Sequence, residues 1–265
     1  MDDRLLAPFT QAPDRGGVLT DFDGTLAPIV EDPTTSRPLP EAVAALHELA
    51  GRYRRVAVVS GRPAAFLAAH LDLARRGPPG AGEGLVAIGL YGLEMADGDR
   101  VTTHPGGADW RSVVAAVADL ADAVAPPGLL VERKGLSLTL HYRTAPAEAG
   151  WARAWAAEQA VRTGLVCHEA RMSQELRPPV AVDKGTAVAR LAAGLGAVCF
   201  FGDDHGDLPA FAVLDRLAGE GVATLKVGVR SAEAPPELLD AADVVVDGPH
   251  GVVAVLSRLL ERPGR

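Results

Sequence analysis

Two aspartates that directly follow a short apolar run constrain the fold of this chain more than any other feature. Residues 17–22 predict a buried strand, Asp21 and Asp23 stand at its end, and Gly24 predicts the tight turn that closes it. Burying a carboxylate without a partner is unfavourable, so a cation or a network of turn hydrogen bonds is expected at this point. In an open α/β sheet, the same strand end is where ligands bind.

Strands and helices alternate on both sides of the middle of the chain. The second predicted strand ends at Ser60-Gly61-Arg62, and Pro63 opens the helix that follows it. The predicted strands of this pattern are 17–22, 55–59, 85–94, 197–201, 222–227 and 243–246, and the predicted helices are 40–52, 63–73, 184–193, 207–217 and 251–260. The alternation predicts an α/β fold whose core is a doubly wound parallel sheet.

The middle of the chain has a different pattern, in which each helix is followed by two strands. The predicted elements are a helix at 109–125, strands at 129–134 and 136–143, a helix at 146–163, and strands at 165–168 and 171–177. We therefore expect an inserted α+β cap domain at 106–178. The core would then consist of residues 1–105 and 179–265.

The composition indicates a globular protein and limits its partners. The chain has 265 residues and a net charge of −8, which argues against a nucleic-acid partner. Two cysteines are too few for a disulfide framework, and no run approaches the roughly 18 apolar residues of a membrane-spanning helix. Residues 1–15 lack the apolar segment of a secretory signal. We expect a cytoplasmic protein with neither nucleic-acid nor membrane partners; its oligomeric state is left open, a monomer being plausible.

The spacing of Asp21 and Asp23 suits phosphoryl transfer. Residues two apart on a strand face the same way, so both carboxylates can meet at one site. A carboxylate can accept a phosphoryl group once a cation neutralises the incoming charge, and a protonated neighbour can assist the leaving oxygen. The alternative is a turn in which both side chains only bond the backbone. Gly24, Thr25 and Leu26 after an apolar strand favour catalysis over that alternative.

The run Asp21-Phe22-Asp23-Gly24-Thr25-Leu26 resembles the first motif of the haloacid dehalogenase superfamily of Mg²⁺-dependent phosphotransferases. Ser60-Gly61-Arg62, then Lys184, then Gly202-Asp203-Asp204 with Asp207 follow in the order of that superfamily. The whole set looks most like the trehalose-6-phosphate phosphatase family. The resemblance covers roughly residues 16–260 and implies the α/β core and the cap described above.

The resemblance implies a role for each motif residue. Asp21 would be the nucleophile that forms an aspartyl phosphate, and Asp23 would act first as general acid and then as general base. Mg²⁺ would be held by Asp21, the main-chain oxygen of Asp23, Asp203 and, through a water, Asp207. Asp204 would either ligate the ion or orient Lys184. The implied phosphate contacts are Thr25, Ser60, Gly61, Arg62 and Lys184. The alternative to phosphate binding is a structural role, in which Ser60 caps a helix and Lys184 is a solvated side chain.

The cap is expected to carry specificity for the sugar. Glu132, Lys134, His141, Arg171 and Glu175 match a sugar-phosphatase pattern, and the alternative is an ordinary solvated sheet face. Several positions depart from the family pattern, among them Arg171, which stands where Lys is usual, and Gly206, which stands where Thr is usual. Tyr91 stands where His is usual, and Leu208 follows Asp207 where Glu is usual.

The leading hypothesis is a Mg²⁺-dependent phosphatase that converts trehalose 6-phosphate to trehalose and phosphate. A phosphatase for another sugar phosphate, such as sucrose 6-phosphate or glucosylglycerol phosphate, would share the core residues and differ only in the cap. A non-catalytic sugar-phosphate sensor is a third hypothesis. A dinucleotide-binding domain is disfavoured because no Gly-x-Gly-x-x-Gly turn follows the first strand.

Overall fold

The computed structural model describes residues 2–75, 83–170 and 172–261, and it divides into two compact units. One unit comprises Met1–Thr102 with Val182–Arg265, and the other comprises Thr103–Ala181. The cap domain expected from the sequence has the bounds 106–178. Among the described residues, no helix combines the length and apolar character that crossing a membrane requires.

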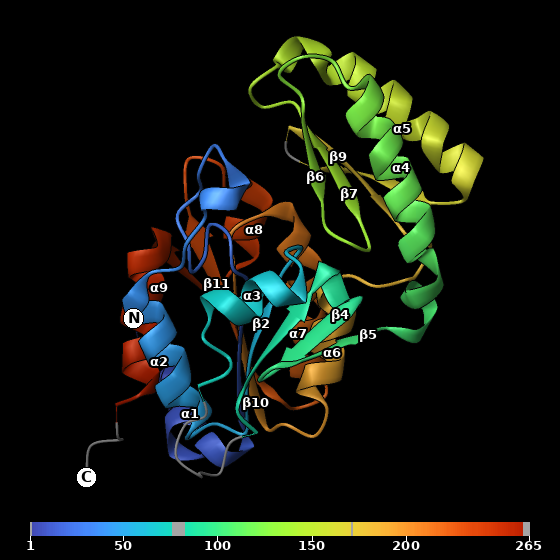
Figure 1. Ribbon diagram of the computed structural model, residues 1–265. Coiled ribbons are helices and arrows are strands. Elements are labelled where there is room, and N and C mark those ends of the chain that lie inside the picture. The colour runs from blue at the N-terminus through green and yellow to red at the C-terminus, as the bar shows by residue number, and fades with distance from the viewer. Residues whose placement is uncertain (1, 76–82, 171, 262–265) are drawn as a thin grey trace. The chain divides into compact units, whose positions relative to one another are not determined.

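Within the described residues, an eight-stranded sheet forms the centre of the first unit (Figure 1). Its order is β12-β11-β10-β1-β2-β3-β4-β5; the neighbours from β12 to β3 are parallel, and β4 runs antiparallel to β3. The strands are β1 (Gly16–Thr20), β2 (Arg55–Val59), β3 (Leu85–Gly89), β4 (Glu94–Asp97), β5 (Arg100–Thr103), β10 (Ala197–Gly202), β11 (Ala223–Arg230) and β12 (Val244–Asp247). The predicted α/β fold class with a parallel sheet core is confirmed.

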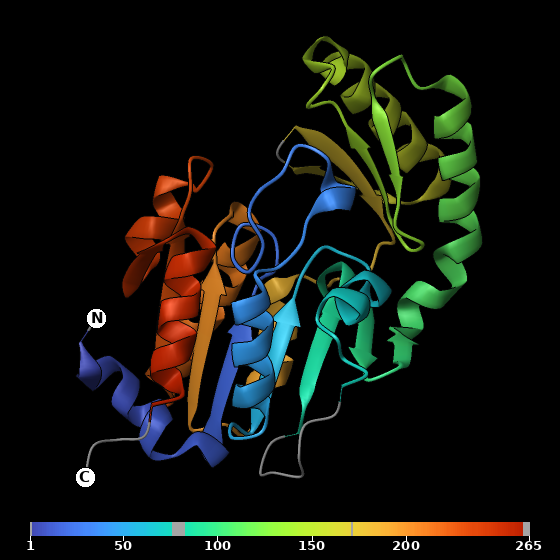
Figure 2. The same cartoon turned by 60° about the vertical axis from the view of Figure 1, so that its left-hand side comes forward.

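Helices cover both faces of this sheet. Figure 2 shows two of them, α2 in light blue and α9 in red, side by side in front of the strands. The helices on this face are α1 (Asp3–Gln11), α2 (Pro40–Ala50), α3 (Ala64–His70) and α9 (Gly248–Leu259), and those on the other face are α6 (Lys184–Ala192), α7 (Leu208–Gly219) and α8 (Pro236–Ala241). Val18 packs into the first layer and Leu19 into the second. All five residues of β1 are buried, and apart from Thr20 at its end the strand carries no polar side chain, so its sequence does not alternate.

The strand expected at 17–22 ends at Thr20, and another expected strand is interrupted by a turn. The sequence predicts a single strand at 85–94, but β3 ends at Gly89 and the chain turns before β4. Leu90 and Tyr91 adopt positive φ angles of 48° and 61°, which extended backbone does not allow. The turn is held by N–H groups of these two residues, which donate to the carbonyl oxygens of Arg62 and Ser60 at 2.9 and 3.0 Å. The expectation was wrong here because these long-range bonds outweigh the local strand propensity.

In the part of the second unit that the structure describes, two α-helices pack on one face of a four-stranded antiparallel sheet. The sheet order is β6-β7-β9-β8. Its elements are α4 (Arg111–Val124), β6 (Leu130–Arg133), β7 (Leu138–His141), α5 (Ala149–Thr163), β8 (Val166–Ala170) and β9 (Ser173–Arg177). Apolar side chains such as Leu138, Leu140 and Leu176 pack against both helices. The alternation along β7 therefore directs Thr139 and His141 to the opposite face.

Candidate active site

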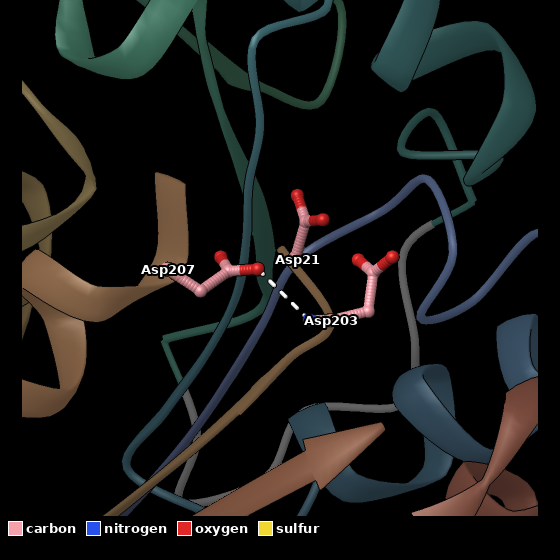
Figure 3. A group of neighbouring side chains, drawn as sticks. All are labelled: Asp21, Asp203 and Asp207. Carbon is pink, nitrogen blue, oxygen red and sulfur yellow. Dashed lines mark hydrogen bonds between the residues drawn. The ribbon is translucent and has the colours of Figure 1, made fainter. Parts of the chain in front are cut away.

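Asp21 and Asp203 lie together because their strands are parallel neighbours. Asp21 follows β1 and Asp203 follows β10, and the Asp21 N–H donates to the carbonyl oxygen of Phe201 at 2.8 Å. Asp207 joins them from the start of α7. One carboxylate oxygen from each of the three aspartates lies within 4.8 Å of the others, and all three are buried (Figure 3). Carboxylate oxygens are the ligands that Mg²⁺ prefers, so this cluster fits a divalent cation.

Asp207 organises the loop that follows β10. Its Oδ2 accepts hydrogen bonds from the N–H groups of Asp203 and Asp204, at 2.9 and 3.1 Å, and the first of these is the dashed line in Figure 3. Its Oδ1 accepts a bond of 2.7 Å from Nζ of Lys184. Both oxygens of Asp207 therefore have protein partners, which suits the water-mediated metal contact expected from the sequence. The side chain of Asp204 is 62% exposed and lies 3.8 Å from Lys184.

Lys184 is the buried cation of the site. It is the first residue of α6, whose N-terminus is capped by reciprocal bonds between Asp183 and Thr186. Its Nζ lies 2.8 Å from Oδ1 of Asp21 as well as 2.7 Å from Asp207. Burial alone lowers the pKa of Lys184, but the charges of Asp207 and Asp21 outweigh burial and raise this pKa well above its usual value. These ion pairs explain a lysine at a helix start, where the helix dipole disfavours positive charge.

The carboxylates outnumber the cation that faces them. Asp21, Asp203, Asp204 and Asp207 surround the single ammonium group of Lys184 among the described residues. Burial raises the pKa of Asp21 to about 6, and burial together with the charge of Asp21 raises the pKa of Asp203 to about 10. A bound cation would oppose both shifts because it favours the ionised forms. The excess of buried negative charge is thus a second observation that fits a divalent ion.

The turn after β1 is shaped to receive Asp203. Gly24 has a φ of 77°, and a Cβ added there would lie 1.9 Å from Oδ2 of Asp203. Glycine is therefore required for both the backbone conformation and the close approach. Thr25, expected to bind phosphate, donates from Oγ1 to Oδ1 of Asp203 at 3.3 Å in the structure.

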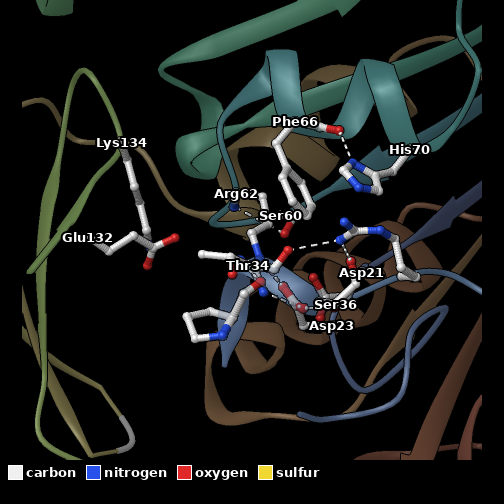
Figure 4. A network of polar contacts seen from close by, with 12 residues as sticks. Asp21, Asp23, Thr34, Ser36, Ser60, Arg62, Phe66, His70, Glu132 and Lys134 are labelled. Atoms are coloured by element: carbon white, nitrogen blue, oxygen red, sulfur yellow. Dashed lines mark hydrogen bonds and ion pairs between the residues drawn. The ribbon is translucent and has the colours of Figure 1, made fainter. Parts of the chain in front are cut away.

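Asp23 is held by an arginine and a serine (Figure 4). Arg62 donates from Nε to Oδ2 of Asp23 at 2.7 Å and from Nη2 to Oδ1 at 2.8 Å. Ser36 donates from Oγ to Oδ1 at 2.7 Å. The guanidinium of Arg62, which was expected to bind phosphate, contacts Asp23 in the structure. Ser36 was missed by the sequence analysis, because a serine in a loop at 28–39 carries no motif or periodic signal.

Ser60 and Gly61 lie at the end of β2, beside Tyr91. The Oγ of Ser60 accepts the Arg62 N–H at 3.2 Å, as a residue that caps a turn would. A Cβ added at Gly61 would lie 2.5 Å from the hydroxyl oxygen of Tyr91, so a side chain at this position would require the Tyr91 ring to move. Tyr91, which departs from the family pattern, thus contacts the expected phosphate-binding turn directly.

Four of the five expected sugar-binding residues lie on the face of the second unit's sheet opposite its helices. Nε2 of His141 and Oε2 of Glu132 are 2.7 Å apart, and Nζ of Lys134 lies 3.7 Å from Glu132 and 3.4 Å from Oε1 of Glu175. Glu175 is buried and also accepts a bond of 2.8 Å from Ser137. Ser137, which was not among the expected site residues, is therefore part of the cluster.

The remaining cap residue cannot be placed in this cluster. Arg171 lies outside the described residues. Arg177 adds a further positive charge, with Nε 3.6 Å from Oε2 of Glu175. Sequence reasoning did not select Arg177 as a site residue, although its position two residues after Glu175 on one strand is the signal that could have done so.

Comparisons with known proteins agree with the geometry. The family model described as trehalose-phosphatase matches residues 19–239. A trehalose-phosphate phosphatase from Mycobacterium marinum is 33% identical over 223 residues, which cover 80% of this chain and 54% of the relative, and one from Mycobacterium avium is 32% identical over 257 residues, which cover 92% and 62%. The chain thus spans between half and two thirds of the length of these curated relatives.

Solved structures share the fold. The C-terminal domain of a trehalose-6-phosphate phosphatase from C. albicans has a TM-score of 0.73 at 22% identity, covering 97% of this chain and 95% of that chain. A haloacid dehalogenase-like hydrolase from Bacteroides thetaiotaomicron has a TM-score of 0.61 at 16% identity, covering 92% and 99%. These likenesses extend over both units, and the family model matches more than half of the residues. The chain belongs to the trehalose-phosphatase family.

Proposed function

We propose that this chain hydrolyses trehalose 6-phosphate to trehalose and phosphate, with Mg²⁺ and through an aspartyl-phosphate intermediate. The observation that carries the proposal is the meeting of Asp21, Asp203, Asp207 and Lys184 at the ends of two neighbouring parallel strands, with Asp23 two residues from Asp21. This arrangement offers a carboxylate nucleophile, a second carboxylate for proton transfer, and a cluster that fits a divalent cation.

In the first step, an oxygen of Asp21 attacks phosphorus and the bond from phosphorus to the sugar oxygen breaks. Asp23 gives its proton to that leaving oxygen, which becomes the sugar hydroxyl. Lys184, which bonds Oδ1 of Asp21 at 2.8 Å, orients the carboxylate and leaves Oδ2 for the attack. The product of this step is a phosphoryl group on Asp21 and a carboxylate on Asp23.

In the second step, Asp23 removes a proton from a water molecule as the water oxygen attacks phosphorus. The bond between phosphorus and Asp21 breaks, inorganic phosphate leaves, and Asp23 is protonated again. The same residue therefore serves as acid and then as base, and both aspartates return to their starting forms.

Asp21, Asp203 and the main-chain oxygen of Asp23 would hold Mg²⁺, with Asp207 contacting it through a water. When bound, the ion neutralises negative charge on the phosphoryl oxygens. Thr25, Ser60, Gly61 and Lys184 would bind the phosphoryl group from the surrounding turns. All four lie in the first unit, close to the ends of β1 and β2 or at the start of α6.

The polar cluster of the second unit would recognise the sugar. Glu132, Lys134, His141 and Glu175 present charged groups that can bond sugar hydroxyls, and Arg171 is proposed to join them on the family resemblance. A cluster built to bond hydroxyls discriminates against a sugar that leaves its buried groups without partners. The names of the mycobacterial relatives favour trehalose phosphate as the substrate, and phosphatases for sucrose 6-phosphate or glucosylglycerol phosphate remain the alternatives.

Phosphate release from a panel of sugar phosphates tests the proposal. The panel contains trehalose 6-phosphate, sucrose 6-phosphate and glucose 6-phosphate, each with Mg²⁺ and with chelator. We expect chelator-sensitive release from trehalose 6-phosphate, abolished by Asp21→Asn. Release from another sugar alone would keep the mechanism and replace the substrate. Binding of trehalose 6-phosphate without turnover, retained in Asp21→Asn, would favour the sensor.

A further inference from the structure

We propose that Arg62 and Ser36 are positioning residues, which hold the carboxylate of Asp23 in the direction needed for proton transfer. The inference rests on the proposed function, in which Asp23 is the general acid and base. It gives Arg62 a different task from phosphate binding and gives a task to Ser36, a loop residue outside the sequence motifs. Proton transfer depends steeply on geometry, so a freely rotating Asp23 side chain would be a poor acid and a poor base.

The guanidinium of Arg62 fixes the plane of the Asp23 carboxylate. Its two hydrogen bonds, 2.7 Å from Nε to Oδ2 and 2.8 Å from Nη2 to Oδ1, use both carboxylate oxygens at once. A planar fork of this kind restricts rotation about the side-chain bonds, whereas a single bond would leave the plane free to turn. The side chain of Asp23 is 38% exposed, so packing alone does not immobilise it.

Arg62 is itself held from several directions. Its Nη1 donates to the carbonyl oxygen of Pro33 at 2.7 Å, and its Cζ lies 4.9 Å from the ring centre of Phe66, a cation–π distance. The Phe66 ring packs in turn edge-on against Phe22 and stacks on His70. These contacts, several of which can be followed in Figure 4, make the guanidinium a rigid support for Asp23.

Ser36 supplies the third hydrogen bond to Asp23. Its side chain is fully buried, and its Oγ donates to Oδ1 at 2.7 Å. Ser36 follows the short 3₁₀ helix η2 (Pro33–Thr35), the same turn whose Pro33 carbonyl accepts from Arg62. One turn of the loop at 28–39 is therefore hydrogen-bonded both to Asp23 and to Arg62, which supports Asp23. The loop is anchored in turn by the Leu39 N–H, which donates to the Leu26 carbonyl oxygen at 2.9 Å.

The test compares Arg62→Lys and Ser36→Ala with the unchanged protein on two substrates. Lysine keeps the positive charge and loses the fork, and alanine removes one hydroxyl. Thr35→Val is the matched control, because the Thr35 hydroxyl lies in the same turn and bonds the Asp32 carbonyl oxygen instead of Asp23. The substrates are trehalose 6-phosphate and p-nitrophenyl phosphate, and inorganic phosphate serves as a competitive inhibitor. Thermal unfolding of each variant checks that it is folded.

We expect kcat on trehalose 6-phosphate to fall about 100-fold in Arg62→Lys, as for a small misplacement of a catalytic group. In Ser36→Ala we expect a fall of about 10-fold, the size of one hydrogen bond to a charged group. KM and the inhibition constant of phosphate should change by less than about twofold, since neither residue would bind the phosphoryl group. On p-nitrophenyl phosphate, whose leaving group departs without a proton, both variants should show a rapid burst of p-nitrophenol followed by slow turnover.

Other results would overturn the inference. A phosphate inhibition constant that weakens together with KM in Arg62→Lys would make Arg62 a phosphate-binding residue. An unchanged kcat in Ser36→Ala, or an equal loss in Thr35→Val, would remove the positioning role of Ser36. If the protein without substitutions is active and the variants give these contrary results, this inference alone is defeated. If the protein without substitutions turns over none of the substrates, the proposed function is defeated as well. Should Arg62→Lys fail to fold, Ser36→Ala still decides.

Discussion

The ammonium nitrogen of Lys184 lies 2.8 Å from Oδ1 of Asp21, and both side chains are almost fully buried. The same nitrogen bonds Asp207, whose other oxygen accepts the N–H groups of Asp203 and Asp204. Lys184 therefore connects the proposed nucleophile with the residue that orders the metal-binding loop. A buried ion pair is sensitive to the loss of one member, because the partner is left as an unpaired charge.

We expect Lys184→Met to be both inactive and less stable. Methionine keeps the length of the side chain and removes the charge, so Asp21 loses its orienting partner and Asp207 its buried cation. Phosphate release should fall by at least about 100-fold, as for the loss of one electrostatic stabiliser. The free energy of unfolding in urea should fall by about 3 kcal/mol. Lys226→Met is the matched control, since Lys226 pairs with Asp215 and Asp243. If both variants kept full activity, Lys184 would have no part in the reaction.

The sequence predicted the fold well because the core strands are buried on both faces. β10 is a continuous apolar run and β1 is one except for Thr20, and helical segments lie between the core strands; a parallel sheet covered on both sides accommodates that pattern. The meeting of Asp21 and Asp203 was expected from the family resemblance, which implies that both hold the same ion; the rule that ligands bind at the carboxyl ends of such strands is consistent with it. Lys184 was found through the family motif and could not have been found from periodicity.

The contacts of Asp23 could not be predicted in the same way. Ser36 reaches Asp23 only because of the path that the loop at 28–39 takes, and a loop has no repeating pattern from which a path can be read. Arg62 stood in a recognised motif, but the sequence does not say whether a guanidinium faces phosphate or a carboxylate. The turn at Leu90 and Tyr91 was missed for a related reason, since hydrogen bonds to residues far away in the sequence hold it.

We expect Gly24→Ala to disturb the metal site. The added Cβ would lie 1.9 Å from Oδ2 of Asp203, so the carboxylate has to move, and alanine is also strained at a φ of 77°. Gly194→Ala is a close control, because Gly194 has a φ of 78° and no atom within 4 Å of an added Cβ. Both variants should lose about 1 kcal/mol of stability from backbone strain. Only Gly24→Ala should need a higher Mg²⁺ concentration for half-maximal phosphate release; an unchanged Mg²⁺ requirement would contradict the proposed role of Asp203.

We expect Glu175→Gln to weaken sugar recognition and spare phosphoryl transfer. Glu175 is buried between Ser137 and Lys134 on the polar face of the second unit, and an amide cannot replace its charge there. KM for trehalose 6-phosphate should rise at least about 10-fold, while kcat/KM for p-nitrophenyl phosphate stays the same, because that substrate has no sugar hydroxyls. Glu169→Gln provides the control, since Glu169 is exposed and pairs with Arg153. An equal loss on both substrates would indicate that Glu175 only stabilises the unit.

Without a divalent ion, the protein should become less stable as the pH rises. Burial raises the pKa of Asp21 to about 6 and that of Asp203 to about 10, whereas both groups ionise near 3.8 without that burial. Between about pH 4 and 10 the folded protein thus binds more protons than the unfolded chain, and its free energy of unfolding falls with increasing pH. Urea unfolding from about pH 5 to 8 in chelator should show this decline, and saturating Mg²⁺ should flatten it because the ion binds the ionised carboxylates. Asp203→Asn should make the decline shallower but not flat without any metal, because the raised pKa of Asp21 remains. A stability that rises with pH in chelator would mean that these carboxylates are already ionised and stabilised by the protein alone.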